Sequence, residues 1–216
     1  YYFIMELIEV DAPKSFIAGA KIPEEVCDNL VDFYNTCDYL LREPGSCGHG
    51  VDKKVKDSID MTIPVHLKDK RVQDFLDQLG EVTIQYINRY PFFGKISWDL
   101  ISPFNVQKYE PGGGFFQMHT EKMASQYEVS QRVMAWMTYL NTVDEGGYTY
   151  FPTQEAKIKP VKGLTILWPA DWTHFHQGIP APNETKIIAT GWYDYTMRPV
   201  PPDDSGEVRE QETGTE

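Results

Sequence analysis

The spacing of apolar residues predicts two amphipathic helices in the first half of the chain. Residues 23–41 begin with a proline and two glutamates and then place apolar side chains at broadly helical intervals. Residues 71–90 repeat apolar side chains close to the 3.6-residue period, and Pro91 ends the run. Residues 43–50, between the two helices, are rich in glycine and proline and are predicted to form a mobile loop.

After residue 96 the pattern changes to short apolar segments separated by turn residues, which is typical of a β-sandwich or β-barrel. The strand candidates are residues 104–109, 132–141, 148–151, 163–168 and 186–195. Glycine, proline and aspartate at residues 144–147, 169–170 and 180–185 suit the reversals between them. We therefore expect a mainly β core that is supported by helices.

The chain has 216 residues, which suits a single domain with a substantial core. We expect that domain to cover residues 1–198, with helical support from residues 23–90 and the β core at residues 96–195. Residues 199–216 are rich in acidic residues and proline and have no apolar periodicity, so they are predicted to be a disordered tail.

Composition excludes some partners and indicates a compartment. The net charge of -12 argues against nucleic acid, because a basic surface is needed to bind phosphates. The three cysteines form no CxxC motif, and an odd number of cysteines does not suit a set of disulfide bonds. Both observations favour a reducing compartment. The first ten residues lack a basic leader and a cleavage site, and no apolar run has membrane-spanning length, so we expect a cytoplasmic protein without a membrane partner.

A candidate metal site begins with His119 and Glu121, whose side chains would share one face of a strand. The third ligand would be His174 or His176, which strand periodicity alone does not distinguish. Two imidazoles and one carboxylate leave three positions open on a metal, as non-haem Fe(II) oxygenases require for a keto acid and O2. Lys186, next to an apolar strand, would need a carboxylate partner if buried; the alternative is a lysine that reaches water at the strand end.

Further motifs surround these residues at defined spacings. They are residues 107–112, Phe116, His119, residues 131–134, 139–141 and 145–152, Gly163, and residues 168–169, 176–180 and 186–192. Together they resemble the prolyl 4-hydroxylase branch of the 2-oxoglutarate and Fe(II)-dependent oxygenases over residues 97–195. The resemblance implies a double-stranded β-helix, the jelly roll of the cupins, and a strand near residues 57–63 ahead of the second helix.

The resemblance also selects the distal metal ligand. In the family a glycine follows this histidine within two residues, a proline often follows at four, and the basic residue that binds 2-oxoglutarate comes about ten residues later. Gly178, Pro180 and Lys186 fit this spacing when counted from His176 and do not fit it when counted from His174. His174 is then expected to be a core histidine or one that orients a ligand.

The same resemblance implies roles for residues around the metal. Lys186 would bind the distal carboxylate of 2-oxoglutarate, and the hydroxyl groups of Tyr109 and Thr149 would add hydrogen bonds. Arg132 and Trp192 would contact a peptide substrate; the alternative for Trp192 is a place in the core, where strand tryptophans are more often found. Residues 43–62 would form a lid over the peptide or, alternatively, an ordinary solvated loop.

The expected function is hydroxylation of prolyl residues at C4 in a peptide or protein, a procollagen-proline 4-dioxygenase type of reaction. It would use Fe(II), 2-oxoglutarate and O2, release succinate and CO2, and have ascorbate as a candidate reductant. Glu121 stands where most relatives have aspartate, but any carboxylate there favours hydroxylation over halogenation. Alternatives are hydroxylation of another residue, a free amino acid or a nucleobase, and a non-catalytic cupin-like binding protein.

Overall fold

The computed structural model describes residues 7–9, 15–48, 50–122 and 127–196, so the predicted tail at residues 199–216 lies outside the described residues. Two long helices and several short helical turns accompany thirteen β-strands in this part of the chain. The helices are α1 (Glu24–Thr36), α2 (Lys70–Arg89) and α3 (Tyr127–Ser130), and the 3-10 turns are η1 (Phe93–Lys95) and η2 (Trp172–His174).

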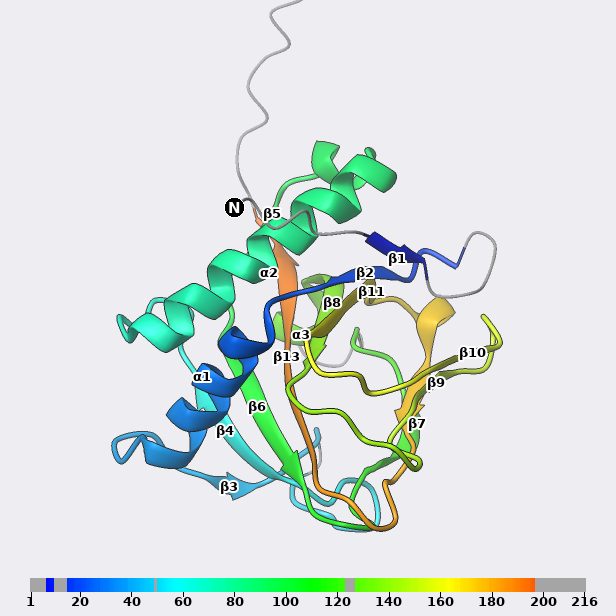
Figure 1. Cartoon of the computed structure of the whole chain (residues 1–216). Coiled ribbons are helices and arrows are strands. Elements are labelled where there is room, and N and C mark those ends of the chain that lie inside the picture. Colours follow the sequence, from blue (N-terminus) through cyan, green and yellow to red (C-terminus); the bar gives the residue numbers. More distant parts are fainter. Residues whose placement is uncertain (1–6, 10–14, 49, 123–126, 197–216) are drawn as a thin grey trace, which may run out of the picture.

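The strands form two antiparallel sheets that face each other (Figure 1). The larger sheet has the order β1 (Leu7–Glu9), β2 (Ala18–Lys21), β11 (Leu164–Pro169), β8 (Arg132–Tyr139), β13 (Lys186–Tyr195), β6 (Phe104–Tyr109), β4 (Ile59–Ile63) and β3 (Glu43–Pro44), with β5 (Trp98–Asp99) beside β13. The smaller sheet has the order β10 (Ala156–Ile158), β9 (Thr149–Phe151), β12 (His176–Gly178) and β7 (Phe115–His119). The predicted fold class, a mainly β jelly roll with supporting helices, is confirmed.

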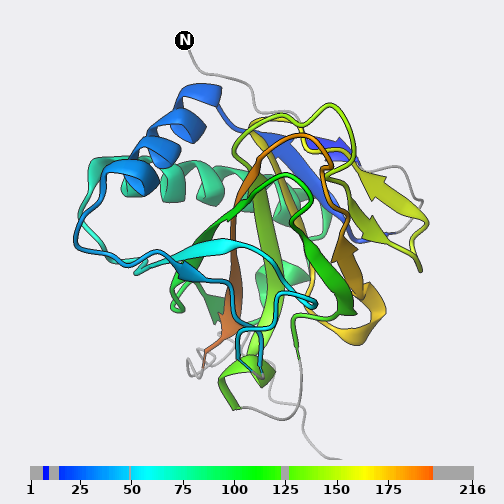
Figure 2. The ribbon, with the colours of Figure 1, turned by 90° about the horizontal axis from the view of Figure 1, so that it is seen from below.

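Helices α1 and α2 lie side by side on the outer face of the larger sheet, as the view from below also shows (Figure 2). Helix α2 begins after Asp69, whose carboxylate accepts a hydrogen bond from the Arg71 backbone N–H at 2.9 Å. Helix α1 ends at Thr36, earlier than the predicted residue 41. The reason is that the backbone of Cys37 is extended. In addition, the Arg42 guanidinium donates hydrogen bonds to the carbonyl oxygens of Tyr34 and Cys37 at the end of the helix.

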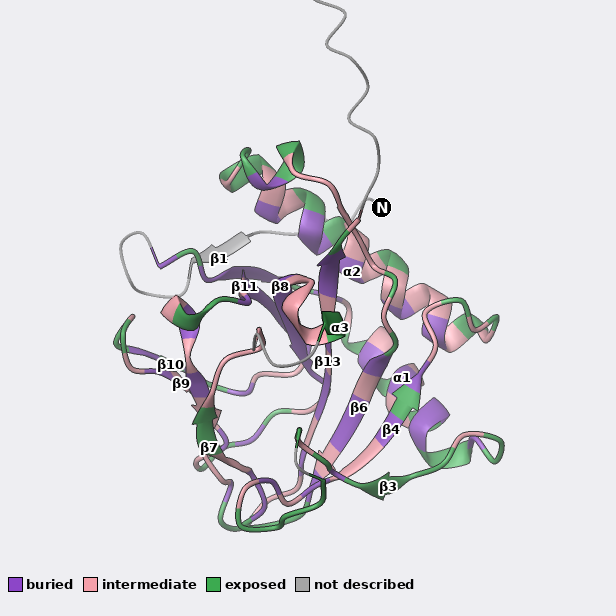
Figure 3. Ribbon diagram, turned by 180° about the vertical axis from the view of Figure 1, so that it is seen from behind, coloured by how far each residue is buried: buried purple, intermediate pink, exposed green. Residues whose placement is uncertain are grey.

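Strand β8 is buried on both faces and separates two hydrophobic clusters, as its unbroken burial shows (Figure 3). Met134 and Trp136 belong to the cluster beneath the helices. Ala135, Met137 and Tyr139 belong to the cluster between the two sheets. This explains why the strand is a continuous apolar run instead of an alternating one.

The first or last residues of several strands differ from the sequence prediction. Strands at residues 104–109 and 186–195 have the predicted limits, and β8, β9 and β11 begin or end one or two residues away from them. The strand predicted near residues 57–63 is β4. The segment predicted as a loop contains β3, which pairs with β4, and its mobility stays a prediction. Short strands β2, β7, β10 and β12 were not predicted as elements.

Two predictions about strand geometry are wrong. Strand β7 ends at His119, so Glu121 lies in the bend that follows the strand and does not share its face by periodicity. His174 lies in the 3-10 turn η2, so it does not alternate with His176 along one strand. Among the residues that the structure describes, no helix is both long enough and apolar enough to span a membrane.

Candidate metal centre and adjoining pocket

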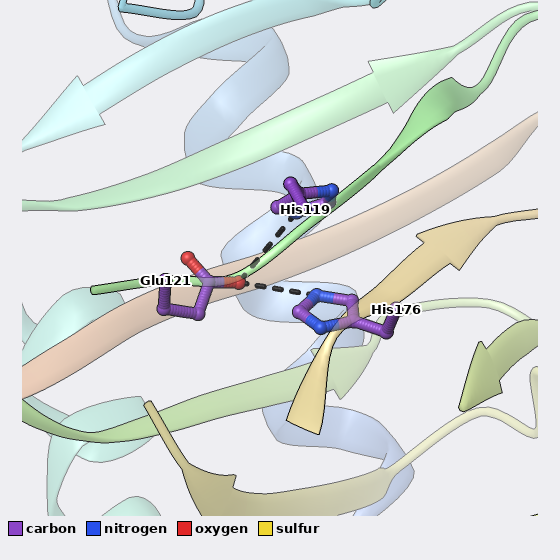
Figure 4. Close-up of side chains that lie close together, drawn as sticks. All are labelled: His119, Glu121 and His176. Atoms are coloured by element: carbon purple, nitrogen blue, oxygen red, sulfur yellow. Dashed lines mark ion pairs between the residues drawn. The ribbon is translucent and has the colours of Figure 1, made fainter. Parts of the chain in front are cut away.

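His119, Glu121 and His176 come together beside the paired strands β7 and β12 (Figure 4). Strand pairing brings the two histidines together, because His176 of β12 lies opposite His119 of β7. Glu121 Oε1 lies 3.2 Å from His176 Nε2 and 3.8 Å from His119 Nε2. One potential ligand atom from each residue lies within 4.8 Å of the other two, which is compatible with a single shared metal ion.

Backbone carbonyl groups fix the orientation of both imidazole rings. His119 Nδ1 is 2.9 Å from the Gln117 carbonyl oxygen, and His176 Nδ1 is 3.0 Å from the His174 carbonyl oxygen. An Nδ1–H that donates to a carbonyl leaves the Nε2 lone pair free for a metal. Both Nε2 atoms face the Glu121 carboxylate.

The charge states suit metal binding. Burial, together with the charge of His176, lowers the pKa of His119 to about 4, so this imidazole is neutral near pH 7. Burial alone would raise the pKa of Glu121, but the proximity of His176, His119 and Arg132 outweighs it and holds the pKa well below its usual range. A neutral imidazole and an ionised carboxylate are the forms that ligate a divalent metal. This donor set fits Fe(II).

Lys186 lies at the far side of the same cavity, opposite Tyr109 on the neighbouring strand β6. Its side chain is only 5% exposed, and Nζ donates a hydrogen bond to the Gly147 carbonyl oxygen at 3.0 Å. Burial lowers the pKa of Lys186 to about 8. Within the described part of the chain no carboxylate is paired with this ammonium group, so the pocket offers a buried cation to an anionic ligand.

The turn before β9 positions the Gly147 carbonyl oxygen that accepts the hydrogen bond from Lys186. Gly146 and Gly147 both have positive φ angles, +72° and +68°, which glycine adopts without the steric cost that a Cβ atom would add. The glycine pair predicted as a reversal therefore places the Gly147 carbonyl oxygen beside Lys186.

Two side chains with hydroxyl groups, Tyr109 and Thr149, line the same pocket as Lys186. Tyr109 lines the pocket, its ring centre lies 5.3 Å from Lys186 Nζ, and its hydroxyl donates to Gln107 Oε1 at 2.7 Å. Thr149 also lines the pocket, and its Oγ1 accepts a hydrogen bond from the Tyr139 hydroxyl at 2.6 Å. Because Thr149 is the acceptor in that bond, its own proton is free to be donated to a ligand.

Arg132 and Trp192 contact Glu121. Trp192 Nε1 donates to Glu121 Oε2 at 2.8 Å, and Arg132 Nη1 donates to the Glu121 carbonyl oxygen at 2.9 Å. The Arg132 guanidinium also lies over the Trp192 ring, 3.4 Å from its centre. Both side chains line the cavity beside the metal-site residues.

His174 is buried and turned away from the centre. Its Nε2 atom lies 2.7 Å from the Ser15 carbonyl oxygen, and its Nδ1 atom lies 2.9 Å from Thr173 Oγ1. Both ring nitrogens therefore have partners outside the metal site. Its backbone carbonyl, by contrast, orients the His176 ring.

One cavity of about 1250 Å³ contains all eight residues predicted for the site. It extends from Lys186 and Thr149 past the metal-site residues to the segment between α1 and β4. Tyr39, Leu41 and Cys47 line its outer end. The volume exceeds that of a typical pocket for one small ligand, so there is room for a second, larger molecule.

Comparison with known proteins agrees with this geometry. Residues 104–194, which include all eight predicted site residues, match the sequence pattern of the 2OG-Fe(II) oxygenase superfamily. This matched segment covers less than half of the chain and is similar to that superfamily. The resemblance predicted from the motifs is thus confirmed.

The proteins that this chain is similar to include prolyl 4-hydroxylases. Prolyl 4-hydroxylase 13 of Arabidopsis thaliana is 28% identical over 118 residues, which cover 44% of this chain and 43% of the relative. The chain therefore matches less than half the length of that curated relative. Among solved structures, a Pseudomonas putida prolyl-4-hydroxylase has a TM-score of 0.65 at 17% identity, covering 84% of this chain and 94% of the other.

A second solved structure is the viral collagen prolyl hydroxylase of Paramecium Bursaria Chlorella virus-1 in complex with 2OG. It has a TM-score of 0.60 at 20% identity and covers 90% of this chain and 98% of the other. Both structural likenesses extend well beyond the matched segment, because they cover 90% and 84% of this chain. They support the jelly-roll fold.

Sequence reasoning missed two polar residues that hold hydroxyl groups of the pocket: Gln107, which lines the pocket, and Tyr139, which contacts the pocket residue Thr149. Tyr139 and Gln107 were part of the motifs, but neither was singled out. Both are buried polar side chains on apolar strands, and such side chains usually need a specific partner. That signal could have identified them as the residues that hold the Thr149 and Tyr109 hydroxyls.

Proposed function

We propose that this protein is a 2-oxoglutarate- and O2-dependent hydroxylase that acts on prolyl residues of a peptide or protein. The observation that carries the proposal is the convergence of two imidazoles and one carboxylate at one end of a cavity that also contains Lys186, a buried lysine paired with no carboxylate of the described residues. A metal bound at that end and a dicarboxylate bound between it and Lys186 would satisfy both features.

In this proposal His119, Glu121 and His176 hold Fe(II). Lys186 binds the distal carboxylate of 2-oxoglutarate, the Thr149 hydroxyl donates a hydrogen bond to it, and Tyr109 closes the same wall of the pocket. When bound, Fe(II) with 2-oxoglutarate and O2 supplies the oxidising chemistry, which releases succinate and CO2 and inserts one oxygen atom into a C–H bond. Ascorbate is proposed as the reductant that keeps the metal ferrous.

The protein's own contribution is orientation and the exclusion of water. Carbonyl groups hold both imidazoles with Nε2 toward the metal position, and the apolar side chains of Phe115, Phe151 and Trp168 pack around the rings. The burial of Lys186 makes its ion pair with a carboxylate stronger than it would be in water.

A prolyl peptide is the proposed substrate because the cavity continues beyond the cosubstrate pocket to the segment at residues 39–52. The relatives' names support the same choice, since they describe prolyl 4-hydroxylases and a collagen prolyl hydroxylase. We propose Arg132 and Trp192 at the boundary between the metal residues and this groove as the side chains nearest to a bound peptide. The segment at residues 43–62 is the proposed lid.

We further propose that residues 1–198 form one domain and that the protein works in a reducing, cytoplasmic environment. The two hydrophobic clusters share strand β8, which supports a single folding unit. Cys27, Cys37 and Cys47 are free thiols, which supports the compartment, and fractionation of cells that express a tagged chain would test it.

Peptide hydroxylation with a mass-spectrometric readout tests the proposed reaction. Proline-containing peptides should gain one oxygen atom on proline, with succinate formed in equal amount, whereas matched peptides with alanine in place of proline should not. Reactions without Fe(II) or without 2-oxoglutarate are the controls. Equal turnover of free proline would indicate an amino-acid hydroxylase, and no consumption of 2-oxoglutarate with any substrate would refute the enzymatic function.

A further inference from the structure

The two oxygen atoms of Glu121 have different partners. Oε1 faces the two imidazoles, 3.2 Å from His176 Nε2 and 3.8 Å from His119 Nε2. Oε2 faces the opposite way and accepts a hydrogen bond from Trp192 Nε1 at 2.8 Å. Oε1 of this carboxylate therefore faces the proposed metal position, and Oε2 is fixed by its hydrogen bond to Trp192.

Trp192 is held in turn by Arg132 on the neighbouring strand β8. The guanidinium lies 3.4 Å from the centre of the indole ring, a distance at which a cation interacts strongly with the π-system. Arg132 Nη1 also donates to the Glu121 backbone carbonyl at 2.9 Å and lies 3.9 Å from Oε2. One arginine thus fixes both the indole that holds the carboxylate and the backbone from which the carboxylate extends.

This support matters because residue 121 is a glutamate in the bend after β7. Compared with aspartate, glutamate has one additional rotatable bond, and no strand hydrogen bonds fix its backbone. A carboxylate with that freedom could turn either oxygen, or neither, toward the metal position. An indole N–H only donates, so it selects one oxygen and leaves the other to coordinate.

We propose that Trp192 and Arg132 are positioning residues for the metal site, which hold Oε2 of Glu121 so that Oε1 alone faces the metal. The pair adapts the site to the longer acidic ligand. The inference rests on the proposed function for the presence of a divalent metal, but it concerns metal affinity and not turnover. It adds a role to the proposed contact of these side chains with a peptide.

Co(II) binding to the full chain under anaerobic conditions tests the inference directly, read by calorimetry and by the visible absorption of the bound ion. Trp192→Phe keeps the ring and removes the N–H, and we expect Co(II) affinity to fall at least about 10-fold with a changed absorption spectrum. Arg132→Met should cause a smaller loss in the same direction. Trp136→Phe is the matched control, because its buried indole N–H has no hydrogen-bond partner among the described residues and it lies in the neighbouring strand.

A double substitution separates positioning from a general loss of structure. In Glu121→Asp the shorter side chain withdraws the carboxylate from Trp192 by roughly one bond length, so the added Trp192→Phe change should alter Co(II) affinity by less than about twofold. Thermal unfolding of each metal-free variant verifies that it is folded. If Trp192→Phe binds Co(II) as tightly as the wild type, or loses the same factor in both backgrounds, the positioning role is refuted.

The outcome also differs from a failure of the proposed function. If the wild type binds Co(II) and the Trp192 effect depends on Glu121 but no 2-oxoglutarate is consumed, the positioning role stands and the hydroxylase proposal falls. If 2-oxoglutarate is consumed but Trp192→Phe leaves affinity unchanged, the hydroxylase proposal stands and the positioning role falls. Absence of Co(II) binding by the wild type would overturn both.

Discussion

Lys186 should destabilise the protein whenever its anionic partner is absent. Burial lowers its pKa from 10.5 to about 8, and each tenfold change in an acid constant is worth about 1.4 kcal/mol. Keeping this amine charged at pH 7 in the folded state therefore costs about 3 kcal/mol. Replacing it by methionine, which has a similar length and no charge, removes the cost and also the hydrogen bond to Gly147, worth about 1 kcal/mol.

We therefore expect Lys186→Met to be more stable than the wild type by about 2 kcal/mol at pH 7 without ligand. The pH dependence has a defined sign. Between pH 8 and 10.5 the unfolded chain binds more protons than the folded one at this position, so wild-type stability rises with pH. The advantage of the variant is complete below pH 8 and disappears as the pH approaches 10.5.

Urea denaturation at several pH values measures both quantities, with exposed Lys159→Met as the control, for which a change within about 0.5 kcal/mol is expected. In a second series with Mn(II), 2-oxoglutarate at 100 times its dissociation constant should stabilise the wild type by about 2.7 kcal/mol and leave Lys186→Met unaffected. A variant that is less stable than the wild type at pH 7, or whose stability difference does not change above pH 8, would refute the reasoning.

Three further substitutions test other parts of the structure. Glu121→Ala should abolish iron-dependent consumption of 2-oxoglutarate, and undiminished turnover would remove Glu121 from the site. The buried ammonium group of Lys56 lies 2.5 Å from Asp60 Oδ2, and Asp60→Asn removes this counter-charge. The free energy of unfolding should therefore fall by about 3 to 5 kcal/mol. A loss below about 1 kcal/mol would contradict this expectation. Gly146→Ala places a Cβ atom against the Pro180 carbonyl at positive φ, so thermal unfolding should show a loss of about 2 kcal/mol or more, and an unchanged melting temperature would contradict the clash.

The sequence predicted best those elements whose apolar pattern is uninterrupted and clearly bounded. Strands β6 and β13 have the predicted limits because turn residues flank each apolar run. Helix α2 was predicted to within one residue, since Pro91 follows it and its apolar residues repeat regularly. The end of α1 could not be predicted in the same way, because it depends on Arg42, which returns from the following segment to bind the helix carbonyls.

For the candidate site, the identity of the residues could be predicted from the sequence, but their contacts in space could not. The resemblance to a known oxygenase family identified His119, Glu121 and His176, and the structure brings these three side chains together. Spacing could not show how they meet, because the pairing of β7 with β12 is a contact between segments more than fifty residues apart. The contacts of Trp192 and Arg132 with Glu121 depend on three separate segments, so no local pattern indicates them.

The two-sided burial of β8 limits how the molecule can be divided. The segment that matches the superfamily starts at Phe104 and so excludes both long helices. Met134, Trp136 and Tyr193 would then lose the helical cover under which they pack. An excised fragment of residues 104–194 would present a broad aromatic and aliphatic face to water, which favours aggregation over folding. Truncations that retain the candidate site should therefore also retain helices α1 and α2, which cover this face of the larger sheet.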